Sequence, residues 1–294
     1  MTDTKINWYP GHMARTRRLL GDQLSRIDLV IELCDARLPL SSRNPDLMRM
    51  TRGKKHILVL NKADLASAAS TEVWLKAFRE EGISVTAMNA GRIQAKELQH
   101  LIEKATEDLS RRARERGYLK TLKAMVVGVP NVGKSTFINR LNGKKIAQTG
   151  DRPGVTRNQQ WIKVGQYLDV LDTPGLLWPR LDDQQAARRL SYLGTIRDDI
   201  LNLDELTISL LDELMIRSPE QLMQRMHIED GTVRGLALLD AACRGRGWLL
   251  KGNEMDYDRA CRVILDEFRE GKIGRITLEM PRISEAGEGA EKRE

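Results

Sequence analysis

Cysteine, histidine and aromatic residues are few in this sequence. Its three cysteines, Cys34, Cys243 and Cys261, lie far apart and form no C-x-x-C pair. Such a set predicts reduced, buried thiols and argues against a disulfide framework or a zinc site. The four histidines show no metal-ligand spacing, and aromatic residues make up only 4% of the chain. The low aromatic content argues against a surface that stacks nucleic-acid bases.

Long hydrophobic runs are also missing. No stretch approaches the apolar length that spans a bilayer, and residues 1–10 lack the apolar core of a signal peptide. We therefore expect a cytoplasmic protein with no membrane partner. Positive charge, in contrast, is in excess, with a formal net charge of +7. This excess indicates a polyanionic partner, although a solvated basic surface would give the same charge.

The first 180 residues alternate short apolar runs with longer amphipathic stretches. The expected strands are 27–33, 56–60, 83–87, 124–129 and 167–171, the last paired with 160–164 as a hairpin around Gly165. The expected helices are 14–25, 70–80, 95–114 and 134–141. This alternation is typical of an α/β fold in which helices cover both faces of a mostly parallel sheet. We therefore expect an α/β domain over residues 1–180.

Helical spacing replaces this alternation in the rest of the chain. Apolar residues recur three and four positions apart over 200–216, 219–226, 233–243 and 257–270. The pattern predicts a smaller all-α domain over residues 181–282. The polar remainder, 283–294, is expected to be a disordered tail.

The strongest motif is Gly128-Val-Pro-Asn-Val-Gly-Lys-Ser135, which matches G-x-x-x-x-G-K-[ST] between an expected strand and an expected helix. Backbone N–H groups in such a loop surround nucleotide phosphates, and the following helix N-terminus favours their negative charge. Lys134 should reach the β- and γ-phosphates, and Ser135 should bind Mg²⁺. The expected phosphate-binding residues are Asn131, Val132, Gly133, Lys134, Ser135 and Thr136.

A second motif, Asp172-Thr-Pro-Gly175, follows the expected strand 167–171. Its aspartate is placed to give the second protein contact to Mg²⁺, and Gly175 can offer a backbone N–H to the γ-phosphate. Between the two motifs, Thr156 lies in a Gly/Pro-containing segment that could close on Mg²⁺ and the γ-phosphate. Thr149 is the competing candidate for this contact.

The base-recognition motif comes earlier in the chain. Asn61-Lys-Ala-Asp64 ends the expected strand 56–60 and matches N-K-x-D. The Asp64 carboxylate can accept hydrogen bonds from N1–H and the 2-amino group of guanine, which adenine cannot supply. Asn61 should steady this pocket, and the stem of Lys62 should pack along the base. Asn89 and Ala90, although they depart from the usual S-A-x form, are expected to offer a backbone N–H to guanine O6.

With N-K-x-D ahead of the phosphate-binding loop, the chain resembles the circularly permuted GTPases. Within these it is similar to the ribosome biogenesis GTPase A family, also called YlqF. The residues that carry this resemblance are Trp8-Tyr-Pro-Gly-His-Met13, Asp35-Ala-Arg-Leu-Pro39 and Arg43-Asn-Pro45. The resemblance implies a P-loop GTPase domain with permuted motif order, a helical C-terminal domain, GTP or GDP with Mg²⁺ as ligands, and a role in late assembly of the large (50S) ribosomal subunit. The expected partner is a precursor of that subunit, and we expect a monomer.

Hydrolysis is expected to need an unusual arrangement. Many GTPases carry a glutamine after D-x-x-G to orient the attacking water, and this chain has Leu176 there. With Lys134 and Thr156, His12 is a candidate catalytic residue because an imidazole can orient or deprotonate water near neutral pH. The segment around His12 could instead be a structural plug or a ribosome contact. Asn131 also resembles the asparagine of GTPases that bind K⁺ beside the phosphates.

Two other functions share part of this motif set. A P-loop kinase or an ATPase would share the phosphate loop, but N-K-x-D argues against both. A GTP-responsive RNA-binding module that does not hydrolyse GTP is also compatible with Leu176. The basic stretches 111–116 and 244–251 suit contacts to rRNA phosphates, and either could equally be a solvated surface. The D-x-x-G loop leads straight into the expected helical domain, so loss of the γ-phosphate should alter how that domain is held.

Overall fold

The computed structural model describes residues 11–92, 94–144, 147, 160–177 and 183–281. A six-stranded sheet forms its centre, with strand order β3-β2-β1-β4-β6-β5. The strands are β1 (Leu29–Asp35), β2 (Lys55–Asn61), β3 (Val85–Ala87), β4 (Leu122–Gly128), β5 (Gln160–Val164) and β6 (Leu168–Asp172). All neighbours pair in parallel except β5 and β6, which form the predicted antiparallel hairpin. The mostly parallel sheet is therefore confirmed.

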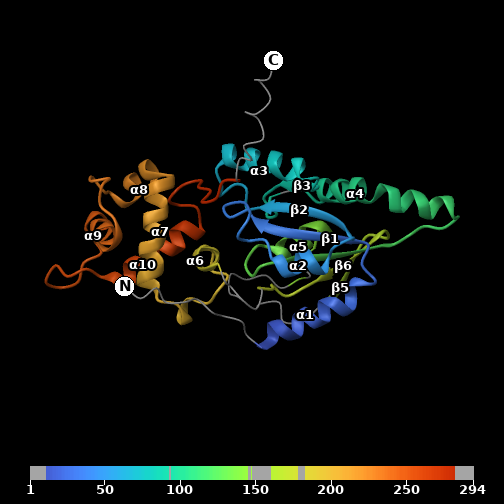
Figure 1. Cartoon of the computed structure of the whole chain (residues 1–294), viewed down its shortest axis with the longest axis horizontal. Coiled ribbons are helices and arrows are strands. Elements are labelled where there is room, and N and C mark those ends of the chain that lie inside the picture. The colour runs from blue at the N-terminus through green and yellow to red at the C-terminus, as the bar shows by residue number, and fades with distance from the viewer. Residues whose placement is uncertain (1–10, 93, 145–146, 148–159, 178–182, 282–294) are drawn as a thin grey trace, which may run out of the picture.

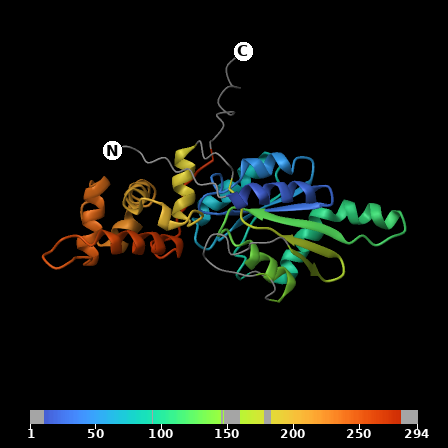
Figure 2. The same cartoon turned by 90° about the horizontal axis from the view of Figure 1, so that it is seen from below.

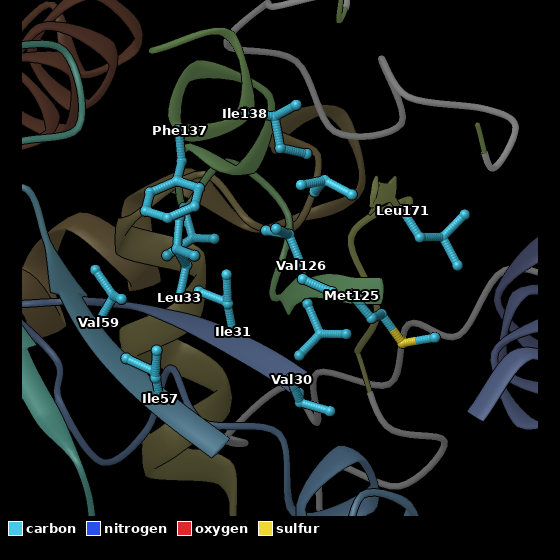
Figure 3. Close-up of a cluster of buried hydrophobic side chains, with 14 of the residues drawn as sticks. Val30, Ile31, Leu33, Ile57, Val59, Met125, Val126, Phe137, Ile138 and Leu171 are labelled. Atoms are coloured by element: carbon cyan, nitrogen blue, oxygen red, sulfur yellow. The ribbon is translucent and has the colours of Figure 1, made fainter. Parts of the chain in front are cut away.

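The central strands are buried along their whole length. Every residue of β1, including Val30, Ile31 and Leu33, is buried because the strand has neighbours on both edges and helices on both faces. Figure 3 shows these side chains packed with Ile57 and Val59 of β2 and with Phe137, which lies in the helix α5 (Lys134–Asn142). The mostly apolar sequence of β1 is the consequence of this double coverage, and its buried Glu32 is paired with Arg43 and His56.

Helices cover both faces of the sheet. They are α1 (Gly11–Leu24), α2 (Pro45–Met50), α3 (Ala68–Glu80), α4 (Ala95–Glu115) and α5 (Lys134–Asn142). Figure 2 shows α1 and α2, in blue, on one side of the sheet and α5, in green, on the other. The short helix α2 was not predicted. It begins after Asn44, whose side chain accepts hydrogen bonds from the N–H groups of Asp46 and Leu47.

A second group of helices follows the sheet at one end of the molecule (Figure 1). These are α6 (Gln184–Tyr192), α7 (Leu203–Arg217), α8 (Pro219–Met226), α9 (Gly235–Arg246) and α10 (Tyr257–Arg269), with the 3-10 turn η1 (Asp198–Ile200) between α6 and α7. They share an apolar core separate from that of the sheet. The predicted fold class, an α/β domain followed by a smaller helical one, is confirmed. None of the described helices combines the length and hydrophobicity that a membrane crossing requires.

The two domains are packed against each other through the loop after β1. Leu38 belongs to this loop, yet it is fully buried within the apolar core of the helical domain. At the other end of the chain, residues 271–281 leave α10 and return to the sheet domain, where the main-chain N–H of Leu278 donates to the Arg37 carbonyl over 3.0 Å. The predicted tail 283–294 lies outside the described residues.

Replacing Leu38 with alanine tests this packing. Because Leu38 is 0% exposed, Leu38→Ala should lower the free energy of unfolding by about 2–4 kcal/mol. Leu40, which is 60% exposed, provides the matched control, and Leu40→Ala should change stability by less than ~0.5 kcal/mol. Urea denaturation of both variants measures the difference, and equal effects would contradict the assignment of Leu38 to the interdomain core.

Candidate functional site

The motif residues meet at one edge of the sheet. Since β1, β2, β4 and β6 run parallel, their carboxyl ends lie along the same edge. Asp35 is paired in register with Asn61, and Gly128 with Leu33. Asp172 ends β6 on the far side of β4. Motifs that are widely separated in sequence are therefore brought to a single crevice.

The phosphate-binding loop packs too tightly for side chains at two positions. A Cβ on Gly128 would lie 2.4 Å from the Leu33 carbonyl oxygen, and one on Gly133 would lie 2.5 Å from Asn61 Nδ2. Both glycines also have positive φ, +151° and +98°, which favours glycine. Helix α5 begins directly after Gly133, so its first N–H groups point into the loop. The loop is shaped to hold an anion.

Lys134 lies buried beneath this loop. Its Nζ donates to the carbonyl oxygens of Gly128 over 3.2 Å and Val129 over 2.9 Å. Burial lowers the pKa of Lys134 to about 8, against the opposing effect of the Asp172 charge. The ammonium thus lies against the carbonyls of the predicted phosphate-binding loop.

Asp172 has the properties of a cation ligand. Both of its carboxylate oxygens are buried and lack a hydrogen-bond partner in the described part of the chain. Burial raises its pKa to about 6, although Lys134 and the Thr173 backbone N–H act to lower it. A buried carboxylate with unfilled lone pairs is costly unless a cation binds it. Together with the Ser135 hydroxyl at the start of α5, it fits the predicted Mg²⁺ site.

The D-T-P-G loop is pressed against the phosphate-binding loop. A Cβ on Gly175 would lie 2.6 Å from Pro130 Cα, and the Leu176 N–H donates to the Gly128 carbonyl over 3.2 Å. The side chain of Leu176 is buried in the sheet-domain core, and its carbonyl accepts a hydrogen bond from Asn44 Nδ2 over 2.9 Å. The Leu176 side chain therefore lies in the apolar core and has no polar group that could orient water.

Asn61 connects the base-recognition loops to the phosphate loop. Its Nδ2 donates to the Val132 carbonyl over 2.7 Å, and its Oδ1 accepts from the Ala90 N–H over 2.8 Å. One buried amide therefore holds together three segments, around residues 61–64, 89–90 and 131–133. This contact accounts for the steadying role expected of Asn61.

Lys62 and Asn131 make further contacts across the same edge. Lys62 has φ +58°, and its Nζ donates to the Asn131 carbonyl over 2.8 Å and lies 3.5 Å from Asp35 Oδ2. The Asn131 amide donates to the carbonyl of Gly194, after α6, over 2.6 Å. In this structure the asparagine predicted to bind K⁺ contacts the helical domain.

Arg37 joins the two domains. In the sequence it was noted only as part of the motif 35–39, which carries the family resemblance. Its guanidinium makes two 2.9 Å hydrogen bonds to the Asp35 carboxylate and donates to the carbonyls of Phe268 and Arg269 at the end of α10. Burial alone would raise the pKa of Asp35, but Arg37 and Lys62 lower it to about 2. The sequence could have indicated the pair with Asp35, because Arg37 follows this strand-end aspartate by two residues. It gave no signal for the contacts with the carbonyls of α10.

Three predicted site residues are not placed. Thr156 and its competitor Thr149 lie outside the described residues. His12 lies in the first turn of α1, and its side chain is outside the described part of the structure.

Two other predicted site residues are placed. Asp64 is half-buried in the loop after β2, and Thr136 follows Ser135 in α5.

The family model for 50S ribosome-binding GTPases matches residues 123–229, which begin just before the phosphate-binding loop. Ribosome biogenesis GTPase A of Bacillus cereus is 43% identical over 97% of this chain and 97% of its own length. The chain belongs to the ribosome biogenesis GTPase A family. The member from Priestia megaterium is 44% identical over 94% of this chain and 97% of its own length.

A solved structure agrees with this assignment. The GNP-bound YlqF from T. maritima matches with a TM-score of 0.64 and 26% identity over 91% of this chain and 99% of its own. The predicted membership of the ribosome biogenesis GTPase A family and the permuted motif order are therefore confirmed. The N-K-x-D motif at 61–64 precedes the region matched by the family model.

The ionisation of Asp172 predicts a pH dependence of stability. Because the folded pKa of Asp172 is raised, its contribution to the stability of the ligand-free fold is greatest below the unfolded value near 3.8 and is lost as pH rises through about 6. The loss should reach roughly 2–3 kcal/mol by pH 7. Lys134 stays protonated over this range in both states, since its folded pKa is about 8.

Denaturant unfolding between pH 4 and pH 7, in a chelator and without nucleotide, measures this dependence. The variant Asp172→Asn should lack the decline, since an amide does not titrate. If wild type and variant lose stability in parallel, the buried carboxylate is not its source.

Proposed function

We infer that this chain is a GTPase that converts GTP to GDP and phosphate and acts in assembly of the large ribosomal subunit. The observation that carries this function is the Asn61 amide, which holds the phosphate loop and the base-recognition loops in one frame. A P-loop kinase or an ATPase would not require the guanine-recognition loop N-K-x-D at that position.

We propose the following division of labour among the site residues. Asp64 recognises the guanine edge, with Asn61, Lys62, Asn89 and Ala90 forming its surroundings. The phosphates are held by residues 131–136 and by the N–H of Gly175. Ser135, Thr156 and Asp172 would hold Mg²⁺, which when bound neutralises charge on the β- and γ-phosphates. Lys134 would then exchange its loop carbonyls for phosphate oxygens.

The connection between the site and the helical domain supports a nucleotide-dependent switch. The loop that ends β6 packs on Pro130 through Gly175, and the chain then continues to α6. The Asn131 amide contacts Gly194 after that helix. Loss of the γ-phosphate would change both contacts at once. We propose that the helical domain, over residues 181–282, binds rRNA of the subunit precursor and is released in this way.

A second candidate is a GTP-responsive binding module that does not hydrolyse GTP. The burial of Leu176 favours it, because no side chain at this position can orient water. GTP turnover separates this candidate from the first. Location in the cytoplasm and a monomeric state remain parts of the proposal.

The decisive measurement is GTP hydrolysis by the purified chain, alone and with large or small ribosomal subunits. Stimulation by large subunits only is the expected result, because the partner must order the residues that position water. Running the same assay in KCl and in NaCl tests K⁺ binding near Asn131, for which faster turnover in KCl is expected. Binding of GTP without turnover under every condition would support the second candidate, and equal rates in the two salts would contradict the K⁺ site.

His12 is the proposed group that orients or deprotonates the attacking water. His12→Ala should lower the turnover stimulated by large subunits roughly 100-fold, the usual contribution of a general base. The affinity for GTP should stay unchanged, because the histidine is not part of the phosphate loop. His100→Ala, on the exposed surface of α4, is the matched control. Unaltered stimulated turnover would instead favour a structural or ribosome-contacting role for the segment.

A further inference from the structure

The chain segment after α10 lies against the loop that carries Asp64. Arg275 donates from Nε to the Ala66 carbonyl over 3.1 Å and from Nη2 to the Ala63 carbonyl over 3.3 Å. One guanidinium thus spans both sides of Asp64. Figure 1 shows this segment, in red, crossing from the helical domain towards α3 of the sheet domain.

Two main-chain contacts extend the same attachment. The Ile276 N–H donates to the Leu65 carbonyl over 3.2 Å. The Ser67 N–H donates to Thr277 Oγ1 over 3.2 Å. With the two bonds from Arg275, four backbone groups of the loop have partners in residues 275–277. They are the carbonyls of Ala63, Leu65 and Ala66 and the N–H of Ser67. Two further main-chain bonds support the loop: the Leu65 N–H donates to the Lys62 carbonyl over 2.9 Å, and the Ala63 N–H donates to the Met88 carbonyl over 3.2 Å.

The segment is also closely packed on this loop. A Cβ on Gly271 would lie 2.8 Å from Leu65 Cδ2, at a position where φ is +73°. Ile276 is 1% exposed. A peptide that rested loosely on the surface would leave Ile276 open to solvent. The segment is therefore packed on the loop in a defined position.

Beyond the loop, the end of the segment is anchored independently. Trp74 Nε1 of α3 donates to the Glu279 carbonyl over 2.9 Å. The Glu279 carboxylate accepts from the backbone N–H groups of Leu40 and Ser41, from the Ser41 hydroxyl and from Arg189. Residues 275–277 are therefore held between α10 and Glu279. Because they are fixed at both ends, their hydrogen bonds can fix the backbone of the loop around Asp64.

We propose that Arg275, with Ile276 and Thr277, is the positioning element for guanine recognition. It holds the backbone on both sides of Asp64 so that the carboxylate presents two oxygens to the base edge. This inference rests on the proposed role of Asp64. Arg275 itself does not touch the nucleotide, and specificity for guanine depends on a segment that follows α10.

The proposal predicts a particular loss of selectivity. Guanine offers Asp64 two donors, N1–H and the 2-amino group, whereas hypoxanthine offers only N1–H. A carboxylate that drifts from its position loses the two-point contact first, because bidentate pairing depends most on geometry. Displacing Arg275 should therefore weaken GDP binding more than IDP binding. General loosening of the domain would weaken both alike.

The experiment measures dissociation constants of GDP, IDP and ADP for the full chain and its variants. Arg275→Ala should weaken GDP binding about tenfold and IDP binding much less, a loss equal to one charge-assisted contact. Arg275→Lys, which can reach one carbonyl but not both, should fall between. Arg262→Ala, at an exposed position of α10, is the matched control and should behave as wild type. In turnover, Arg275→Ala should raise KM and leave kcat unchanged.

The outcomes are separable. Equal weakening of GDP and IDP, or no weakening of either, would overturn the positioning role. If Arg275→Ala does not fold, Arg275→Lys and Thr277→Val carry the same comparison. A wild-type chain that binds ADP as well as GDP would instead show that the proposed role of Asp64 is at fault, before any variant is considered.

Discussion

The buried ion pair of Asp35 and Arg37 is the contact on which the arrangement of both domains depends. Removing a guanidinium and a carboxylate from water costs several kcal/mol for each ion, so the pair persists only if its hydrogen bonds are satisfied. They are satisfied from both domains: two bonds run to Asp35, and two more run to the carbonyls that end α10. The guanidinium also lies over the Phe268 ring, 5.2 Å from its centroid. Because carbonyls at a helix C-terminus carry partial negative charge, α10 favours a cation there.

The same carboxylate extends this network to the nucleotide site. Asp35 lies near Lys62 Nζ, which donates to the Asn131 carbonyl in the phosphate loop. Domain packing and loop conformation thus share one buried charge. The polar groups at the sheet edge thus form a connected series from the end of α10 to the phosphate loop.

Much of the fold could be predicted because its signals are local. The strands β1, β2 and β4 are mostly apolar, as burial on both faces favours. The glycines at 128 and 133 match a loop that tolerates no side chain at these positions. The helix α2 was not predicted, because its six residues are too few to show helical periodicity in a sequence. The strand β3, although only three residues long, lies within the predicted strand 83–87. The contacts of Arg37 and Arg275 could not be predicted, because their partners lie 231 and 209 positions away. Asn131 shows the same limit, since its contact with Gly194 depends on tertiary structure.

The position of Leu38 has a consequence for how the chain acquires its structure. This residue, near the beginning of the sequence, completes the apolar core of helices that are synthesised last. Trp74 likewise finds its partner at Glu279, 205 positions further on. Contacts of such high sequence separation slow folding and form only once the whole chain is available. During synthesis Leu38 therefore stays outside its core until the helices that surround it have been made.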